Sequence, residues 1–195
     1  MKDWVAERSV FLKEWIRAPL VTASIVPSSK TLARAMARGV RPELGPVIEL
    51  GPGTGVITRH LLEAGVPEDQ LILVEVNHYF ANQLRKKFPK ARVIHDSAEN
   101  LGGIKFDQTP AFAVSGIPLM SIPNPKVAEI LKSVFSCLTP DGVFIQFTYA
   151  PRCPVNKKLQ KRLGLQGDIF EMVLRNIPPA GVYHISRVND LRSKR

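Results

Sequence analysis

A glycine-rich stretch, ELGPGTG at residues 49–55, carries the clearest chemical signal in this chain of 195 residues. It follows the apolar run PVIEL and precedes a helical pattern, so the glycines lie where a strand turns into a helix. Glycine lets the backbone turn tightly and approach a ligand closely. Glu75, 20 residues beyond Gly55, ends the next apolar run, where a carboxylate can accept hydrogen bonds from both ribose hydroxyls. The spacing predicts a nucleotide-cofactor site.

Glu49 distinguishes this loop from one that binds a dinucleotide. A dinucleotide fingerprint reads G-x-G-x-x-G, whereas this chain reads G-P-G-T-G with an acid two residues ahead. A carboxylate there is a poor neighbour for a pyrophosphate and a good one for a cationic, amino-acid-like tail. The pattern resembles motif I of class I S-adenosylmethionine-dependent methyltransferases, E/D-x-G-x-G-x-G.

That resemblance implies a set of residues that bind the cofactor S-adenosylmethionine. In such enzymes the second-strand acid, here Glu75, binds the ribose, and an acidic step after the third strand lies along the adenine. The implied cofactor-binding residues are Glu49, Gly51, Gly53, Gly55, Glu75, Asp96, Ser97, Ala98 and Ser115. Asp96 can also be read simply as a turn residue.

Strand-like and helix-like runs alternate along the chain around these residues. Buried-strand patterns occupy 46–50, 71–76, 91–95, 111–116 and 142–149, and helical patterns fill 54–64, 77–88 and 124–137. Two final strands, at 168–177 and 182–187, can pair antiparallel at the end of the sheet. The alternation predicts an α/β fold: a Rossmann-like, mostly parallel seven-stranded sheet with helices on both faces.

Two further helices, at 3–17 and 28–39, are expected ahead of the sheet, with Ser28 or Ser29 capping the second. We therefore divide the chain into N-terminal amphipathic, membrane-binding helices at 1–40 and a methyltransferase domain at 41–195. On the first helix Trp4, Phe11 and Trp15 fall within one arc, and Lys13 and Arg17 flank it. This arrangement is typical of an interfacial helix, although a helix packed on the protein's own core has the same pattern.

Charge is distributed unevenly. The net charge is +10, with +5 on residues 1–41, −2 on 42–151 and +7 on 152–195. Basic ends fit a solvated surface, an anionic membrane or a nucleic acid. The two cysteines suggest neither a disulfide framework nor a metal site. No signal peptide and no apolar run of about 18 residues is found, so we expect a cytoplasmic protein without a metal.

The stretch SGIPL (115–119) follows the fourth predicted strand, where methyltransferases read their acceptor. Enzymes that methylate adenine N6 carry N/D-P-P-Y/F or a similar motif there, and its aromatic ring stacks on the base. Here Ser115 stands in place of Asn or Asp, and Leu119 in place of the aromatic residue. The loop can offer carbonyls to an amine but no ring to a nucleobase, which weakens the nucleic-acid interpretation.

The chain as a whole resembles the bacterial class I phospholipid N-methyltransferases. The matching stretches are FLKEWIRAPLVTASIVPSS (11–29), VIELGPGTGVIT (47–58), SGIPLMSIP (115–123), IQFTYAP (145–151) and VLRNIPPAGVY (173–183). The resemblance implies methylation of the phosphatidylethanolamine amine towards phosphatidylcholine, by a protein bound peripherally to the anionic inner face of the cytoplasmic membrane. Methylation of ornithine lipid, or of ribosomal RNA adenine, remains as an alternative, and the oligomeric state stays open.

Candidate residues for the transfer itself lie at the ends of the later strands. Tyr149 is expected to orient the amine, with help from Ser115 and the carbonyls of its loop. Tyr183 can line the head-group pocket. His184 is a candidate base, although a lone histidine on a strand is more often structural. With the lipid substrate, Trp4, Phe11, Lys13, Trp15, Arg17, Ser28, Ser29 and Tyr183 become the expected substrate- or membrane-binding set.

Overall fold

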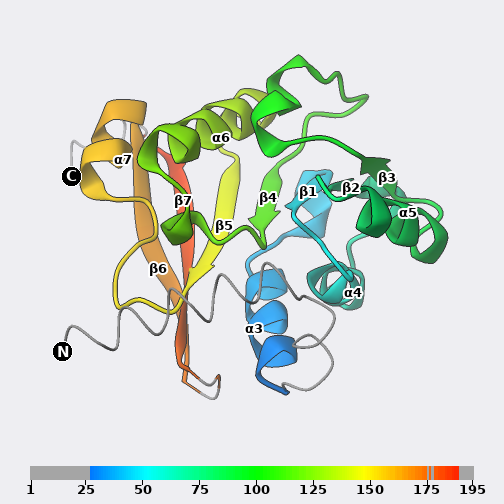
Figure 1. Ribbon diagram of the computed structural model, residues 1–195, viewed down its shortest axis with the longest axis horizontal. Coiled ribbons are helices and arrows are strands. Elements are labelled where there is room, and N and C mark those ends of the chain that lie inside the picture. The colour runs from blue at the N-terminus through cyan, green and yellow to red at the C-terminus, as the bar shows by residue number, and fades with distance from the viewer. Residues whose placement is uncertain (1–26, 175, 177, 189–195) are drawn as a thin grey trace.

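The computed structural model describes residues 27–174, 176 and 178–188, which fold around one seven-stranded sheet (Figure 1). The strands run in the order β3-β2-β1-β4-β5-β7-β6. Strands β1 to β5 are parallel, whereas β7 is antiparallel to both of its neighbours. Their bounds are β1 Val47–Leu50, β2 Leu71–Val74, β3 Arg92–Ile94, β4 Phe112–Ser115, β5 Val143–Thr148, β6 Leu165–Val173 and β7 Ala180–Arg187. The predicted Rossmann-like α/β architecture is confirmed.

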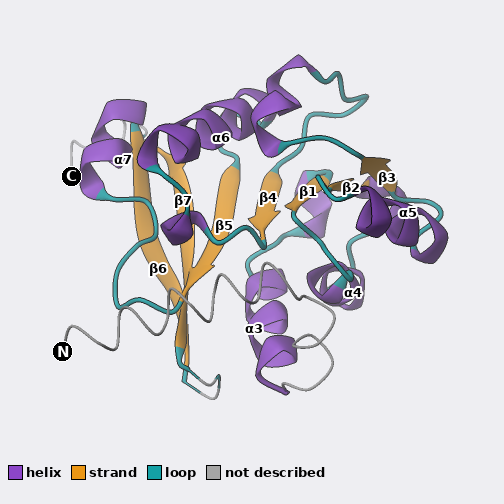
Figure 2. Cartoon of the chain, in the orientation of Figure 1, coloured by secondary structure: helices purple, strands orange, loops and turns teal. Residues whose placement is uncertain are grey.

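Helices cover both faces of the sheet (Figure 2). One face carries α6 (Asn124–Cys137), α7 (Lys157–Leu163) and the 3-10 segment η3 (Ala98–Gly103). The other carries α3 (Pro27–Arg38), α4 (Val56–Glu63) and α5 (His78–Lys87). Three short 3-10 turns, η1 (Pro42–Leu44), η2 (Glu68–Gln70) and η4 (Leu119–Ser121), lie in the connections.

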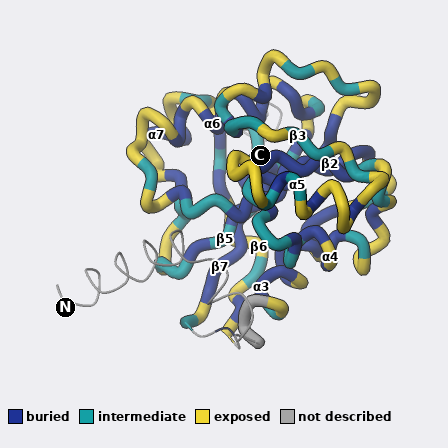
Figure 3. The backbone as a smooth tube through the Cα atoms, turned by 45° about the vertical axis from the view of Figure 1, so that its right-hand side comes forward, coloured by how far each residue is buried: buried dark blue, intermediate teal, exposed yellow. Residues whose placement is uncertain are grey.

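The central strands are mostly apolar because both of their faces are buried. Successive side chains of a strand point to opposite faces. In β1, Val47 therefore packs on the α3 face and Ile48 on the α6 face, and both are fully buried. In Figure 3 most of the central strand residues are coloured as buried, and the exposed residues lie on the helices and connections around them. Two apolar clusters, one on each face, hold the carboxyl ends of the parallel strands in place.

Helix α3 is built into one of these clusters. Ala35 and Met36 are fully buried, and the helix packs closely against α4. Small side chains allow such a close approach between elements. The second predicted N-terminal helix is thus found, one residue earlier than expected, as part of the folded core. The helix expected at 3–17 lies outside the described residues.

The C-terminal third differs from the sequence-based expectation in two places. The strand predicted at 168–177 lies at Leu165–Val173. It starts early because Gly164, with φ 64°, ends α7 and turns the chain directly into β6. It stops at Val173 because a turn containing two prolines follows, and proline has no N–H for a ladder. Helix α7 was not predicted, although Asn156 caps it by accepting a hydrogen bond from the Leu159 N–H at 2.9 Å.

Among the described residues, no helix combines the length and hydrophobicity needed to cross a membrane.

Candidate functional site

Three glycines turn the chain from β1 into α4 at the carboxyl edge of the sheet. Gly51, Gly53 and Gly55 have φ values of 65°, 54° and 78°, a left-handed backbone that other residues rarely adopt. A Cβ on Gly55 would lie 2.6 Å from Cε2 of Phe88. A Cβ on Gly53 would meet no described atom within 4 Å. The loop thus combines a glycine that permits packing with one that is open to a ligand.

Substitution of each of these two glycines by alanine should lower the free energy of unfolding by a different amount. Gly55→Ala should lower the free energy of unfolding by about 2–4 kcal/mol, since the left-handed backbone penalty adds to the overlap with Phe88. Gly53→Ala should cost only about 1 kcal/mol, because only the backbone penalty applies. Urea denaturation of both variants measures the difference. Equal losses would contradict this account of the loop.

Glu49, in β1 beneath the loop, is the most perturbed acid of the site. Its side chain is fully buried, and its Oε2 accepts a hydrogen bond from Thr58 Oγ1 at 2.7 Å. Its Oε1 is buried and has no hydrogen-bond partner among the described residues. Burial raises the pKa of Glu49 to about 8, against the smaller opposing effect of the Thr58 bonds. A buried oxygen without a hydrogen-bond partner can accept a hydrogen bond from a cationic group.

Glu75 follows β2 at the same edge. One of its oxygens accepts the Gly53 N–H at 3.0 Å and the other accepts the Asn77 N–H at 2.8 Å. Asn77 in turn caps α5 by accepting the N–H groups of Tyr79 and Phe80. The carboxylate therefore links the glycine loop to the start of α5. This places its acceptor oxygens beside the turn, as recognition of a ribose requires.

Asp96, Ser97 and Ala98 follow β3, one strand further along the edge. Asp96 Oδ1 accepts hydrogen bonds from Asn100 Nδ2 at 2.7 Å and from the Ser97 N–H at 2.6 Å. These bonds lower the pKa of Asp96, so its carboxylate stays ionised at neutral pH. Ser97 donates to Glu99, and Ala98 is buried. Asp96 thus takes part in a turn, as one interpretation of the sequence predicted. It also lies at the same edge of the sheet as Glu49 and Glu75.

On the other side of β1, the carboxyl ends of β4 and β5 form a buried polar pair. Ser115 and Gln146 are register partners and both are fully buried. Gln146 Nε2 donates to the carbonyls of Ile117 and Phe147 at 3.0 and 3.1 Å. Its Oε1 has no partner among the described residues. Sequence reasoning gave Gln146 no role, because its contact with Ile117 spans 29 residues.

The loop after β4 is more constrained than expected. The Ile117 carbonyl also accepts the Leu119 N–H at 2.9 Å, and the Pro118 carbonyl accepts the Ser121 N–H. The Ile117 carbonyl, which also accepts from Gln146, therefore has both lone pairs engaged. The Pro118 carbonyl keeps one lone pair that can accept a hydrogen bond from an amine. Ser115 Oγ accepts the Ile117 N–H at 3.2 Å. A Cβ on Gly116 would lie 2.8 Å from the Gly51 carbonyl oxygen, so this loop lies directly against the glycine loop.

Tyr149 follows β5 at the same edge. Its ring makes an edge-to-face contact with Phe147, with centroids 5.5 Å apart. Burial raises the pKa of its hydroxyl, and interaction with Asn176 offsets this only in part. The phenol therefore stays protonated at neutral pH. It can donate a hydrogen bond to orient a ligand, but it is a poor base.

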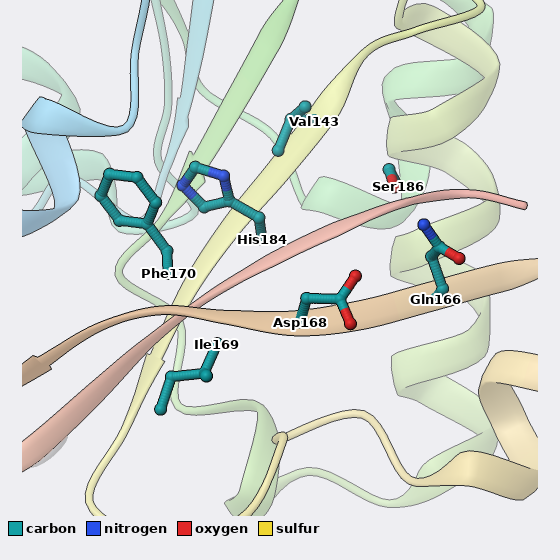
Figure 4. Close-up of a pocket in the computed structure, with 7 residues that line it drawn as sticks. All are labelled: Val143, Gln166, Asp168, Ile169, Phe170, His184 and Ser186. Carbon is teal, nitrogen blue, oxygen red and sulfur yellow. The ribbon is translucent and has the colours of Figure 1, made fainter. Parts of the chain in front are cut away.

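His184, the other catalytic candidate, lies apart from this edge. It pairs with Ile145 in the middle of β5, and its ring stacks on Phe170 with centroids 4.1 Å apart. It lines a hollow of about 270 Å³ together with Asp168 and Gln166 (Figure 4). Burial lowers the pKa of His184 to about 4. The ring is neutral and weakly basic, and it lies on the α3 face, away from the glycine loop. It is therefore not placed to take a proton from a methyl acceptor at the carboxyl edge of the sheet.

The substrate-binding residues expected from sequence are placed only in part. Tyr183, next to His184, points to the opposite face and is buried beside Gly181. Ser28 and Ser29 lie inside the first turn of α3, which begins at Pro27, so neither stands at the N-cap position expected from the sequence. Trp4, Phe11, Lys13, Trp15 and Arg17 lie outside the described residues. Within the described part of the chain, no three His, Cys, Asp or Glu side chains gather as metal ligands would.

Comparison with known proteins agrees with this geometry. Residues 47–142 match the methyltransferase domain family. The chain is 30% identical to an ornithine lipid N-methyltransferase from Singulisphaera acidiphila, over 97% of this chain and 99% of the relative. The chain belongs to the S-adenosylmethionine-dependent methyltransferases. This methyltransferase uses S-adenosylmethionine as its cofactor, and the open Oε1 of Glu49 fits the amino group of that molecule's methionine tail.

Two further similarities bear on the methyltransferase. Its fold matches the Burkholderia thailandensis 1,6-didemethyltoxoflavin-N1-methyltransferase, crystallised with S-adenosylhomocysteine. The TM-score is 0.67 at 16% identity, covering 96% of this chain and 90% of the other. A ribosomal RNA small subunit methyltransferase A from Synechococcus sp. is 31% identical, but only over 57% of this chain and 37% of its own length.

Proposed function

We propose that this methyltransferase transfers methyl groups to the amine of an amino lipid. Ornithine lipid is the first candidate, because similarity to an enzyme of that name extends over nearly the whole of both chains. Phosphatidylethanolamine is the second, because of the stretches that resemble phospholipid N-methyltransferases. The full-length similarity is the observation that carries the proposal, since it includes regions outside the cofactor-binding half.

The acceptor loop supports an amine that is not part of a nucleobase. Leu119 stands where adenine methyltransferases carry an aromatic residue, and its side chain is buried, with 2% exposure. It has neither a ring nor an exposed surface on which a base could stack. The match to the ribosomal RNA enzyme covers only 57% of this chain and 37% of that enzyme.

In this proposal each acid at the carboxyl edge holds one part of the cofactor. Glu49 binds the amino group of the methionine tail, Glu75 the ribose, and Asp96 with Ser97 and Ala98 borders the adenine. The cofactor supplies an electrophilic methyl group on sulfur. A bound cofactor would give up this methyl group to the acceptor nitrogen and leave as S-adenosylhomocysteine, and the nitrogen would release a proton to water. Positioning supplies most of the acceleration for such a displacement.

The acceptor side of the site is assigned to β4, β5 and β7. Ser115 and Gln146 fix the loop that borders the methyl group. Tyr149 donates its hydroxyl proton to orient the acceptor rather than removing a proton from it, because its pKa is raised. Tyr183 lines the head-group side. The N-terminal segment, with Trp4, Phe11 and Trp15, is proposed to bind the anionic inner face of the cytoplasmic membrane.

The test is transfer of labelled methyl groups to defined lipids. The full chain is incubated with methyl-labelled S-adenosylmethionine and vesicles that contain an anionic lipid with either ornithine lipid or phosphatidylethanolamine. We expect label in the mono-, di- or trimethylated products of at least one lipid, and none with Glu49→Ala. If neither lipid is labelled while S-adenosylhomocysteine still binds, the amino-lipid assignment is wrong, and undermodified ribosomal RNA becomes the substrate to test.

A further inference from the structure

Four apolar side chains form a strip along the carboxyl edge of the sheet, on the face covered by α6 and α7. The strip consists of Met120, Ile169, Met172 and Leu174, which are 43%, 53%, 49% and 72% exposed. Its floor is Gly181, because a Cβ there would lie 3.4 Å from Met172 Sδ and 3.8 Å from Ile169 Cδ1. A larger residue at 181 would fill the place where these side chains meet.

The strip begins at the wall of the methyl-transfer site. Met120 follows the Ser115–Pro118 loop, and its Sδ lies 3.1 Å from Thr148 Oγ1. Thr148 is the register partner of Gly181, so Met120 continues the strip across β5 and β7. At the other end, Leu174 follows β6 in the hairpin that projects past the other strands in Figure 1. The strip thus connects the loop beside the glycine turn with an exposed tip.

The acids of β6 are kept off this face. Asp168 and Glu171 pair with His184 and Val182, and register partners on neighbouring strands share a face. Figure 4 shows Asp168 on the side of His184 and Ile169 on the opposite side of the strand. Glu171 is neutralised by Arg38, with an Nη2–Oε1 distance of 2.5 Å. Neither acid of β6 therefore lies on the face that carries the strip.

We propose that this strip is the surface along which the acyl region of a membrane lipid lies while its head group reaches the methyl-transfer site. The inference rests on the proposed amino-lipid substrate. Leu174 enters the interface, and the strip guides the lipid to the loop after β4. The two methionines suit this role, because their flexible thioethers adapt to chains of varied conformation.

A second copy of the chain is the main competing occupant, because β6 is an edge strand. A stable protein interface buries about 800 Å² on each partner, and four partly exposed side chains supply too little area for that. The strip also leads to the reaction site, which pairing between two copies would not require. We therefore assign the strip to lipid and make self-association an outcome of the test.

The first experiment places a tryptophan reporter at the tip. In the full chain with Trp4→Phe and Trp15→Phe, either Leu174→Trp or Val188→Trp is introduced. Val188 is a matched control, since it is 48% exposed and lies near Gly164 at the opposite edge. Vesicles contain phosphatidylethanolamine and phosphatidylglycerol with brominated acyl chains. We expect at least twofold quenching for Leu174→Trp and less than 10% for Val188→Trp.

The second experiment compares methylation of vesicles with methylation of a short-chain, monodisperse form of the same amino lipid. Leu174→Asp should lower the rate on vesicles at least tenfold and the rate on the short-chain lipid less than twofold, and Val188→Asp should change neither. Equal quenching of the two reporters overturns the proposal, as does absent quenching while the reporter protein still sediments with the vesicles. Self-association that is lost in Leu174→Asp overturns it as well. If only Leu174→Trp is quenched and no lipid is methylated, the result supports the strip as a lipid-binding surface and contradicts the proposed amino-lipid head group.

Discussion

Glu49→Gln should weaken binding of S-adenosylhomocysteine by about 100-fold, a loss typical of removing one partner from a buried charge pair. The open Oε1 of Glu49 is the acceptor that we assign to the cofactor's amino group, and a neutral amide cannot supply its charge. Isothermal titration calorimetry measures the change directly. Thr58→Val is the control, since it removes the hydroxyl that donates to Oε2 at 2.7 Å and leaves the carboxyl in place. A larger loss for Thr58→Val than for Glu49→Gln would contradict the assignment.

The same residue predicts how stability depends on pH. The pKa of Glu49 is about 8 in the folded protein, against an ordinary value of 4.5, so the folded state binds this proton more tightly than the unfolded state. Its stabilising effect is therefore complete below about pH 4.5 and is lost as pH rises through about 8. Glu49→Gln should remove this part of the dependence. Urea titrations of both proteins without cofactor, at pH 4 and pH 9, should converge in free energy at pH 4 and diverge at pH 9 in favour of the variant.

Cofactor binding should release a proton from the same carboxyl group. Binding of a cationic amino group favours the ionised form of Glu49, whose pKa then falls. Between pH 6 and 7.5, calorimetry in buffers of different ionisation enthalpy should show release of nearly one proton per S-adenosylhomocysteine, and Glu49→Gln should abolish that release. If Glu49→Gln releases the same number of protons, the released proton comes from another group.

Gln146→Met should lower kcat by about 100-fold while leaving affinity for S-adenosylhomocysteine within about threefold. The amide bonds to the Ile117 and Phe147 carbonyls hold the acceptor loop against β5, and a misplacement of about 1 Å can cost a factor of this size. The carbonyl of Ile117 keeps the Leu119 N–H, so the variant should still fold. Single-turnover methylation measures the effect.

Gln160 offers a matched control for that experiment. It is also buried, with 3% exposure. Its amide donates to the Val155 carbonyl just before α7 and accepts the Gly167 N–H, which joins α7 to β6. Gln160→Met should lower the free energy of unfolding by about 1–3 kcal/mol, because it leaves a buried N–H unpaired, with kcat nearly unchanged. If the two variants lose kcat equally, Gln146 has no special part in positioning the acceptor loop.

The cofactor half of the site was predictable because its signal is local. Three glycines after an apolar run, and acids after the next two runs, determine the turn and the strand ends within short stretches of sequence. Because the strands are parallel, their carboxyl ends lie at one edge of the sheet, whatever the rest of the chain does. The positive φ values of Gly51, Gly53 and Gly55 agree with what that spacing required.

The acceptor half was less predictable because it depends on contacts between distant residues. Tyr183 and His184 are neighbours in sequence, yet only the register of β7 decides which of them faces the α6 side. The role of Gln146 depends on a carbonyl 29 residues away. Helix α7 has caps at both ends, but its lysines and arginines outnumber its apolar residues, so the core-facing pattern is weak.

The contact between Gly116 and Gly51 has a consequence for how such enzymes diverge. Any side chain at 116 would meet the carbonyl of the cofactor loop at 2.8 Å, so mutation there cannot alter the acceptor without also disturbing the donor. Under the proposed function, a change of acceptor is therefore expected to come from substitutions elsewhere, such as beyond Pro118. The donor loop and the parts of the chain that select the acceptor can then change separately.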